Sequence, residues 1–134
     1  MNYVLDCSFT SSLFLPDESS DSTRLFFIKL KSSDVIFVPS LWWHETANVL
    51  KSATKRKRLN FNETLGIIDL IEKLPLQTDG YCGFQHSKEI FKLAQMYDLS
   101  SYDATYLELA IRTKSKLLSH DKEINSVSFK IGLK

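Results

Sequence analysis

VIFVPSLWWHETANVLKSA, residues 35–53, is the stretch that decides the fold of this chain. Its first four residues are apolar without alternation, which is typical of a strand covered on both faces of a sheet. Pro39 and Ser40 end this strand, and we expect Ser40 to cap the helix that follows. Apolar residues then recur every three or four positions. A strand that passes directly into an amphipathic helix predicts a parallel α/β sheet.

The same strand-then-helix pattern recurs on both sides of this stretch. The predicted strands are Tyr3–Leu5, Val35–Val38 and Lys116–Leu118, with weaker ones near Leu76 and at Ser128–Leu133. The predicted helices cover residues 22–31, 41–57, 62–73, 84–97 and 101–114. We therefore expect an α/β fold, a three-layer α/β/α sandwich with a central parallel sheet.

The size and charge of the chain fit one small globular domain, residues 1–134. Of these residues, 43% are hydrophobic and 25% are charged, which is ordinary for such a domain. The net charge is only +1, so no global field attracts the protein to nucleic acid or to an anionic membrane. Any such attraction has to be local.

Nothing in the sequence predicts a membrane segment or a disulfide framework. No apolar run approaches the roughly 20 residues that a spanning helix needs, and the N-terminus MNYVLD reaches an acidic residue early. Cys7 and Cys82 are too few and too far apart to suggest paired cysteines. We expect a soluble, cytoplasmic protein with reduced thiols.

Two acidic residues occupy helix positions that border the core. Glu45 lies three residues after Trp42 and four before Val49, within a predicted buried stripe. Asp103 precedes Leu107 by four residues in SSYDATYLELA. Carboxylates avoid such positions unless they are paired or bind a cation.

Two further acids, Asp6 and Asp121, follow predicted strands (YVLD and KLLSHD). The carboxyl ends of parallel strands share one edge of a sheet, where ligands of open α/β sheets bind. Glu45 and Asp103 lie near the starts of helices, so all four carboxylates are predicted to converge there. Three of the four also have a plainer interpretation, because Asp6, Asp103 and Asp121 could simply cap helices, whereas Glu45 has no obvious capping role.

Four converging carboxylates either take up protons or bind a hard divalent cation. Ligation by oxygen alone favours Mg²⁺ or Mn²⁺ over zinc. Such a centre can activate water and orient a phosphodiester, so hydrolysis of a nucleic-acid backbone fits this chemistry. Our hypothesis is that Asp6, Glu45 and Asp103 bind the main ion, whereas Asp121 binds a second ion or positions the water.

Four blocks of sequence carry a family resemblance: YVLDCSFTSSLFLPDE, VPSLWWHETANVL, LSSYDATYLELA and LLSHDKEI. They resemble the signature blocks of VapC-like PIN-domain toxins, and each block holds one of the four acids. The resemblance implies a PIN-like fold and a Mg²⁺- or Mn²⁺-dependent endoribonuclease activity. It also implies a homodimer and a cognate VapB-like antitoxin that occupies the active-site groove. By the same resemblance, Ser8, Asn48 and Ser119 support the acids.

The C-terminal part departs from this resemblance, because Asn125-Ser-Val-Ser stands where an alanine-rich helix is usual. The last helix and the last strand are therefore the least determined elements. Of the three histidines, only His120 is expected near the acids, and we expect no metal ligand among them.

The chain has one basic cluster, which is expected at the end of the helix that carries Glu45. It consists of Lys51, Lys55, Arg56, Lys57 and Arg58. Contact with an RNA backbone is one interpretation. A solvated helix C-terminus, favoured by the helix dipole, is the other.

Three other functions compete with the ribonuclease. A catalytically inactive RNA- or protein-binding module could use the same fold, although such a module would be expected to lose at least one of the acids. A receiver-like phosphoryl-transfer protein needs an acidic pair near the first strand, which Asp6-Cys7-Ser8 does not supply. A nuclease acting on DNA stays open, because a carboxylate-bound ion does not distinguish the sugar.

Overall fold

The computed structural model describes residues 1–15 and 20–133. Within these residues a parallel sheet runs through the centre of the molecule, in the order β3-β2-β1-β4. Its strands are β1 (Asn2–Leu5), β2 (Val35–Pro39), β3 (Leu76–Asp79) and β4 (Lys116–Leu118). Because all four strands are parallel, their carboxyl ends lie along one edge of the sheet.

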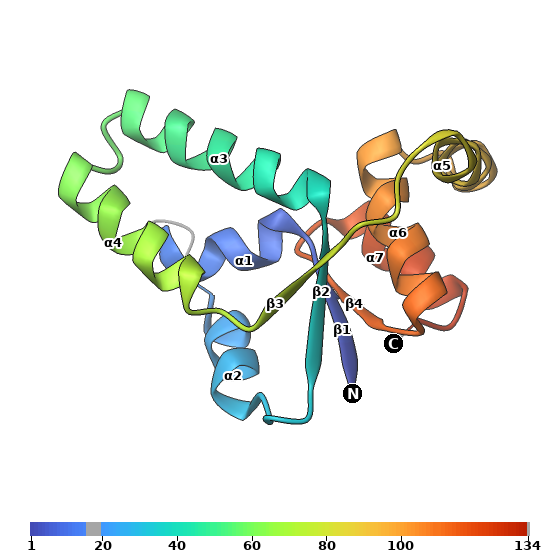
Figure 1. Cartoon of the computed structure of the whole chain (residues 1–134), viewed down its shortest axis with the longest axis horizontal. Helices are drawn as coiled ribbons and strands as arrows, with labels where there is room; N and C mark the ends of the chain where they lie inside the picture. The colour runs from blue at the N-terminus through green and yellow to red at the C-terminus, as the bar shows by residue number, and fades with distance from the viewer. Residues whose placement is uncertain (16–19, 134) are drawn as a thin grey trace.

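Helices cover both faces of this sheet, which Figure 1 shows nearly edge-on. One side carries α1 (Cys7–Phe14), α2 (Asp21–Lys29), α3 (Ser40–Lys55) and α4 (Phe61–Glu72). The other side carries α5 (Phe84–Tyr97), α6 (Ser101–Thr113) and α7 (Lys122–Lys130). The predicted three-layer α/β/α sandwich is therefore confirmed. No helix in the described ranges is long and apolar enough to span a membrane.

The centre of the sheet and the two helices that cross it form the core. The side chains of Val4 on β1 and Val38 on β2 are completely buried. Trp42 of α3 and Leu107 of α6, which lie on opposite sides of the sheet, belong to the same hydrophobic core as these two valines. Burial on both faces explains why the central strands are apolar at consecutive positions.

Most predicted elements are present, with three differences. The strand predicted at Ser128–Leu133 is wrong, because α7 continues to Lys130 and a turn follows. Ile124 and Ser128 are buried while Ser126 between them is exposed, which is a helical and not a strand period. The short helices α1 and α7 are additional to the five predicted ones. Ser40 is the first residue of α3, and Pro39 holds the cap position.

The weak strand predicted near Leu76 is confirmed as β3, at one end of the sheet. Of the first block that carries the family resemblance, residues 16–18 lie outside the described residues. The rest of that block forms β1, the turn at Asp6 and α1. The sheet edge beyond this turn is where the predicted acids have to meet.

Candidate metal centre

Asp6 lies directly after β1 and is held rigidly at the start of α1. Its backbone N–H donates to the carbonyl of Leu118, so pairing between β1 and β4 continues up to this residue. Its Oδ1 accepts from the Ser8 hydroxyl (2.7 Å) and from the Phe9 N–H (3.0 Å). Its Oδ2 accepts from the hydroxyl of Ser119. Although it is only 6% exposed, this carboxylate has several donors.

The loop that follows β4 is bound to the same carboxylate. Ser119 donates its hydroxyl proton to Asp6 and accepts from the N–H of Asp121 at 2.9 Å. The N–H of His120 donates to the Ser8 hydroxyl at 3.1 Å. The hydroxyl groups of Ser8 and Ser119 thus connect the ends of β1 and β4, and the supporting role of these two residues stays a prediction.

His120 lies beside the acids, as expected, but its ring points toward α1 and α2. Its Nε2 lies 3.0 Å from the hydroxyl oxygen of Ser12 and 3.1 Å from that of Thr23, both buried. The ring also contacts Phe9, with centroids 5.1 Å apart. These contacts fix the position of the Ser119–Asp121 loop.

Glu45 lies in the second turn of α3 and is half-buried. Its Oε1 accepts a 2.6 Å hydrogen bond from the hydroxyl of Tyr106, a residue of α6 that is 2% exposed. Burial, followed by the bond to Glu45, raises the pKa of Tyr106, so the hydroxyl remains a donor. Sequence reasoning identified Glu45 but missed Tyr106, whose place in an apolar helix gave no sign of this bond.

Asp103 is the third residue of α6, and Ser100 caps the helix by accepting from the Asp103 N–H at 3.1 Å. The pKa of the Asp103 carboxyl is raised, chiefly by burial and secondly by the negative charge of Asp121. The charges of Asp6 and Glu123 add to the same shift. The Asp103 carboxylate therefore lies within reach of three other acids.

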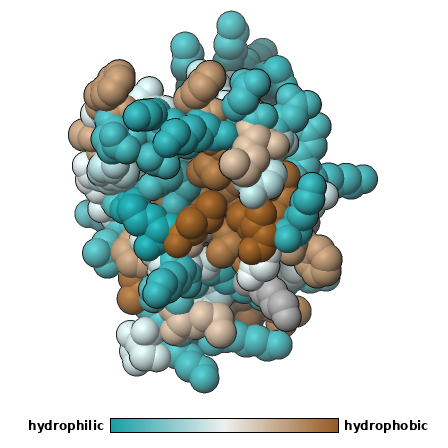
Figure 2. Space-filling view, turned by 90° about the vertical axis from the view of Figure 1, so that its right-hand side faces the viewer, coloured by the Kyte–Doolittle hydropathy of each residue, from teal (hydrophilic) through white to brown (hydrophobic). Residues whose placement is uncertain are grey.

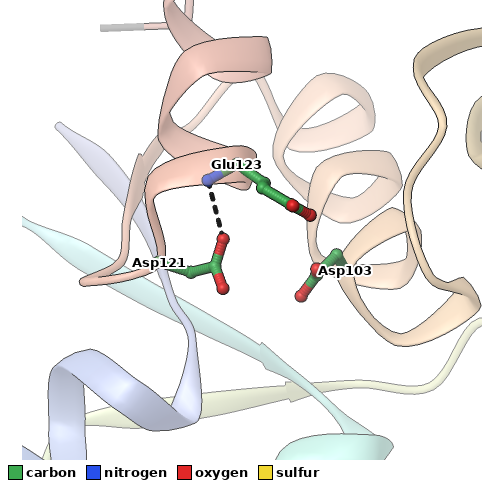
Figure 3. Close-up of side chains that lie close together, drawn as sticks. All are labelled: Asp103, Asp121 and Glu123. Atoms are coloured by element: carbon green, nitrogen blue, oxygen red, sulfur yellow. Dashed lines mark hydrogen bonds between the residues drawn. The ribbon is translucent and has the colours of Figure 1, made fainter.

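Glu123 is an acid of this centre that sequence reasoning missed. Carboxylate oxygens of Asp103, Asp121 and Glu123 lie within 4.8 Å of one another, and Figure 3 shows them pointing into one space between α6 and α7. Asp121 caps α7 by accepting from the N–H groups of Glu123 (2.8 Å) and Ile124 (3.2 Å). In the sequence Asp-Lys-Glu, Glu123 looks like an ordinary residue of a helix start, and only the folded cap brings it together with Asp121 and Asp103.

The four predicted acids lie close enough to repel one another. Burial raises the pKa of Glu45, the bond from Tyr106 opposes this shift, and the charges of Asp6 and Asp103 raise it further. Those two charges belong to residues after β1 and on α6, so the centre joins both layers of helices across the sheet edge. A hard divalent cation would remove this repulsion, and a set of carboxylate oxygens fits Mg²⁺ or Mn²⁺.

The capping interpretation and the metal interpretation do not exclude each other. The side chains of Asp6 and Asp121 accept the capping hydrogen bonds through Oδ1 alone. In Asp103 the backbone N–H donates to the hydroxyl of Ser100, the cap residue. Each of these acids therefore keeps an oxygen beyond those that the helix uses.

The other predicted residues lie on α3 and in the turn after it, on the C-terminal side of Glu45. Asn48 is exposed, three residues after Glu45. The basic cluster occupies the last turns of α3 and the turn after it, where all its members except the half-buried Arg58 are exposed. At 1.5 Å per residue, Lys55 lies about 15 Å along the helix from Glu45. The structure therefore does not bring the cluster into the acidic centre.

The fold and the site together define a class: α/β proteins with a cluster of acidic residues at the carboxyl edge of a parallel sheet. The family model of the PIN domain matches residues 3–130 of the chain. The chain therefore belongs to the PIN-domain family, as its sequence blocks predicted.

Relatives agree with this assignment. Ribonuclease VapC3 of Pyrobaculum aerophilum is 25% identical over 126 residues, which are 92% of each chain. VapC20 of Mycobacterium tuberculosis, described as a sarcin–ricin loop cleaving toxin, superposes with a TM-score of 0.70 at 11% identity, over 93% of this chain and 94% of that one. PAE2754 of Pyrobaculum aerophilum superposes with a TM-score of 0.67 at 20% identity, over 94% of this chain and 84% of that one. The two structures show a shared fold.

Proposed function

We propose that this protein is a Mg²⁺- or Mn²⁺-dependent endoribonuclease that acts as the toxin of a toxin–antitoxin pair. The observation that supports the proposal is an acidic cluster at the carboxyl edge of the sheet, where oxygens of Asp103, Asp121 and Glu123 lie within 4.8 Å of one another and the charges of Asp6 and Asp103 act on Glu45. The similarity to Ribonuclease VapC3 along 92% of the chain supports RNA as the substrate.

The acids divide into two groups that share Asp103. Asp6, Glu45 and Asp103 would hold the main ion, since the pKa of Glu45 responds to the charges of the other two. Asp121 would bind a second, more labile ion, together with Asp103 and Glu123, because these three offer oxygens within 4.8 Å of one another. Asp121 and Glu123 are exposed, which favours a site that exchanges its ion readily.

When bound, the metal would supply an activated water and charge neutralisation at the scissile phosphate. The protein's own groups perform the positioning. Ser8 and Ser119 fix the orientation of the Asp6 carboxylate by donating to its two oxygens. The cap of α7 holds Asp121 against the start of α6. Such preorganised groups need little rearrangement when the reaction occurs.

The basic cluster at the end of α3 would guide RNA toward the acids. Its exposed members include Lys51 and Lys55, about 9 and 15 Å along the helix from Glu45. A strand that lies along α3 could therefore contact both groups of residues. This contact would be electrostatic and independent of sequence.

A VapB-like antitoxin would bind an apolar groove between α3 and α4. This groove is lined by Leu50 and Ile68, and Lys51 and Lys55 stand at its edge. Ile68 also lines a second hollow beside Trp43, so apolar surface continues along α4. An amphipathic segment with acidic residues fits this surface, and its path along α3 would cover the approach to Glu45.

We further propose a homodimer in the cytoplasm. An apolar depression of about 560 Å³, which includes Ile111, Ile131 and Leu133, opens on the face seen in Figure 2. A second copy of the chain would cover this surface, since apolar patches of this kind mark interaction sites. Sedimentation of the purified protein tests the dimer.

A nuclease assay tests the central proposal. Purified protein, freed of any bound small protein, is incubated with total RNA or single-stranded DNA in Mg²⁺, Mn²⁺ or EDTA. Asp6→Ala and Asp103→Ala should abolish cleavage, whereas Asp69→Ala, on the exposed side of α4, serves as control. Defined RNA fragments that vanish with EDTA and with both active-site variants are expected.

Other results would refute parts of the proposal. If the protein cleaved only DNA, the proposed substrate would be DNA instead of RNA. Inactivity of the wild type, with retained binding of RNA or of a protein, would favour the inactive module. In a metal titration, Asp121→Asn should weaken binding of the main ion less than Asp6→Asn does. Equal losses would overturn the proposed division between the two sites.

A further inference from the structure

Tyr106 joins the two helices that carry Glu45 and Asp103. It lies on α6 three residues after Asp103, so the two side chains share one face of that helix. Its hydroxyl crosses to α3 and donates to Glu45 Oε1 at 2.6 Å. With 2% of its surface exposed, the ring is fixed by the core, and so is the direction of the hydroxyl.

We infer that Tyr106 is a positioning residue, which orients the Glu45 carboxylate so that its second oxygen faces the metal. The inference rests on the proposed function and concerns a residue that touches neither RNA nor the ion. A glutamate has one more rotatable bond than an aspartate, so more freedom is lost when it is fixed at a metal site. The hydrogen bond from Tyr106 removes part of this freedom before the ion arrives.

The arrangement at Asp6 supports this inference. There, too, hydroxyl groups hold a carboxylate: those of Ser8 and Ser119, which donate to its two oxygens. At Glu45 the hydroxyl donor comes from α6, the helix that also supplies Asp103. Because one helix carries both the acid and the donor, the separation of Asp103 from Glu45 is set by a single rigid element.

A plainer role for Tyr106 is packing, with a hydroxyl that has merely found a partner. Two variants separate the roles. Tyr106→Phe keeps the ring and removes only the hydroxyl oxygen, whereas Tyr106→Leu removes the ring as well. Tyr3→Phe is the matched control, because Tyr3 packs in a different hydrophobic cluster, edge-on against Phe26.

The experiment measures Mn²⁺ binding to metal-free protein by electron paramagnetic resonance. Loss of a group that holds a metal ligand typically weakens metal binding by roughly 10-fold or more. We expect about this loss for both Tyr106 variants and less than about a twofold change for Tyr3→Phe. With RNA as substrate, kcat should fall in Tyr106→Phe while KM stays unchanged, because no RNA contact is removed.

Equal Mn²⁺ affinity in wild type and Tyr106→Phe, with a loss only in Tyr106→Leu, would show that the ring matters and the hydroxyl does not. That result overturns the inference and leaves the proposed function intact. Absence of Mn²⁺ binding in the wild type would instead refute the proposed function.

A second measurement uses the wild type and so does not depend on how the variants fold. The hydroxyl proton of Tyr106, in a short bond to a carboxylate, should give a deshielded proton resonance that shifts on addition of Mg²⁺. A resonance that stays in place while Mg²⁺ saturates the centre would also overturn the inference.

Discussion

Replacing Asp103 by Asn should stabilise the metal-free protein and remove its stabilisation by Mg²⁺. The Asp103 carboxylate is half-buried and is repelled by its neighbours, chiefly by Asp121. Asn keeps the shape of the side chain without its charge. The substitution therefore relieves repulsion when no cation is present and deletes a ligand when one is.

The size of this effect follows from the separation of the charges. Oxygens of Asp103, Asp121 and Glu123 lie within 4.8 Å of one another. Two unit charges at that distance repel by about 0.9 kcal/mol in water and by about 3.5 kcal/mol at an effective dielectric constant of about 20. Asp121 and Glu123 are exposed, so the value in water is the better guide, and two pairs give roughly 2 kcal/mol. Losing a negative charge at the start of α6 costs about 0.5 kcal/mol, which leaves a net gain of about 1–2 kcal/mol.

Thermal unfolding at pH 7 in EDTA measures this gain. With about 2.1 cal/mol/K of unfolding entropy for each of the 134 residues, the gain raises Tm by about 4–7 °C. Asp69→Asn, exposed on α4, should change Tm little. Addition of Mg²⁺ should raise Tm in the wild type more than in Asp103→Asn. A Tm for Asp103→Asn in EDTA at or below that of the wild type would refute the electrostatic reasoning.

The gain should also depend on pH. Because the pKa of Asp103 in the folded protein is raised above 3.8, the folded state holds this proton more tightly than the unfolded chain does. Below pH 3.8 the Asp103 carboxyl is protonated in both states, so its charge does not lower the free energy of unfolding. This loss of stability grows as pH rises through the pKa of the folded state. The difference in Tm between wild type and variant should shrink accordingly in acid. A difference that does not change with pH would have another cause.

Three further substitutions test other parts of the structure. Ser119→Ala should lower kcat by roughly 10-fold with little change in Tm, because Asp6 loses one of its donors; initial rates and melting curves measure this. The double variant Lys51→Gln/Lys55→Gln should raise KM for RNA and reduce the slope of log KM against log salt by about 1.4, as measured by salt titration. Arg112→Met should destabilise the protein by about 2 kcal/mol in urea unfolding, because it leaves the buried Glu108 without its main cation. The value is set below that of a fully buried pair because the Arg112 side chain is 35% exposed.

For each of these three predictions, one outcome would contradict the reasoning. An unchanged kcat in Ser119→Ala would mean that Ser8 and the α1 N–H suffice to hold Asp6. An unchanged salt slope in the lysine variant would assign the basic cluster to a solvated helix end. Unaltered stability in Arg112→Met would show that its ion pairs, with Asp79 and Glu108, contribute nothing measurable.

Much of the fold could be predicted from local sequence, because burial on both faces leaves a strong record. The strands at Tyr3–Leu5 and Val35–Val38 read as apolar runs, and each of the five predicted helices is present within two residues at either end. The strand predicted at Ser128–Leu133 is wrong, because a short segment of mixed polar and apolar residues shows little periodicity. Its helical state depends on packing of Ile124 and Ser128 against the rest of the molecule.

The candidate site divides in the same way. Asp6, Glu45, Asp103 and Asp121 were identifiable because each is acidic where a strand ends or a core stripe begins, and such positions exclude charge unless it has a function. Glu123 and Tyr106 were not. Glu123 looks like an ordinary residue of a helix start, and Tyr106 looks like an ordinary core aromatic.

The sequence by itself determined the parallel sheet, its covering helices and the four acids, because hydrophobic period and misplaced charge are local properties. Only the tertiary structure decided what those acids contact: a tyrosine hydroxyl from a neighbouring helix, a serine hydroxyl from the next strand end, and a fifth carboxylate. These contacts join residues as far apart as Asp6 and Ser119. No local pattern encodes them, since side-chain hydrogen bonds between distant segments form only when packing has fixed the distance between their backbones.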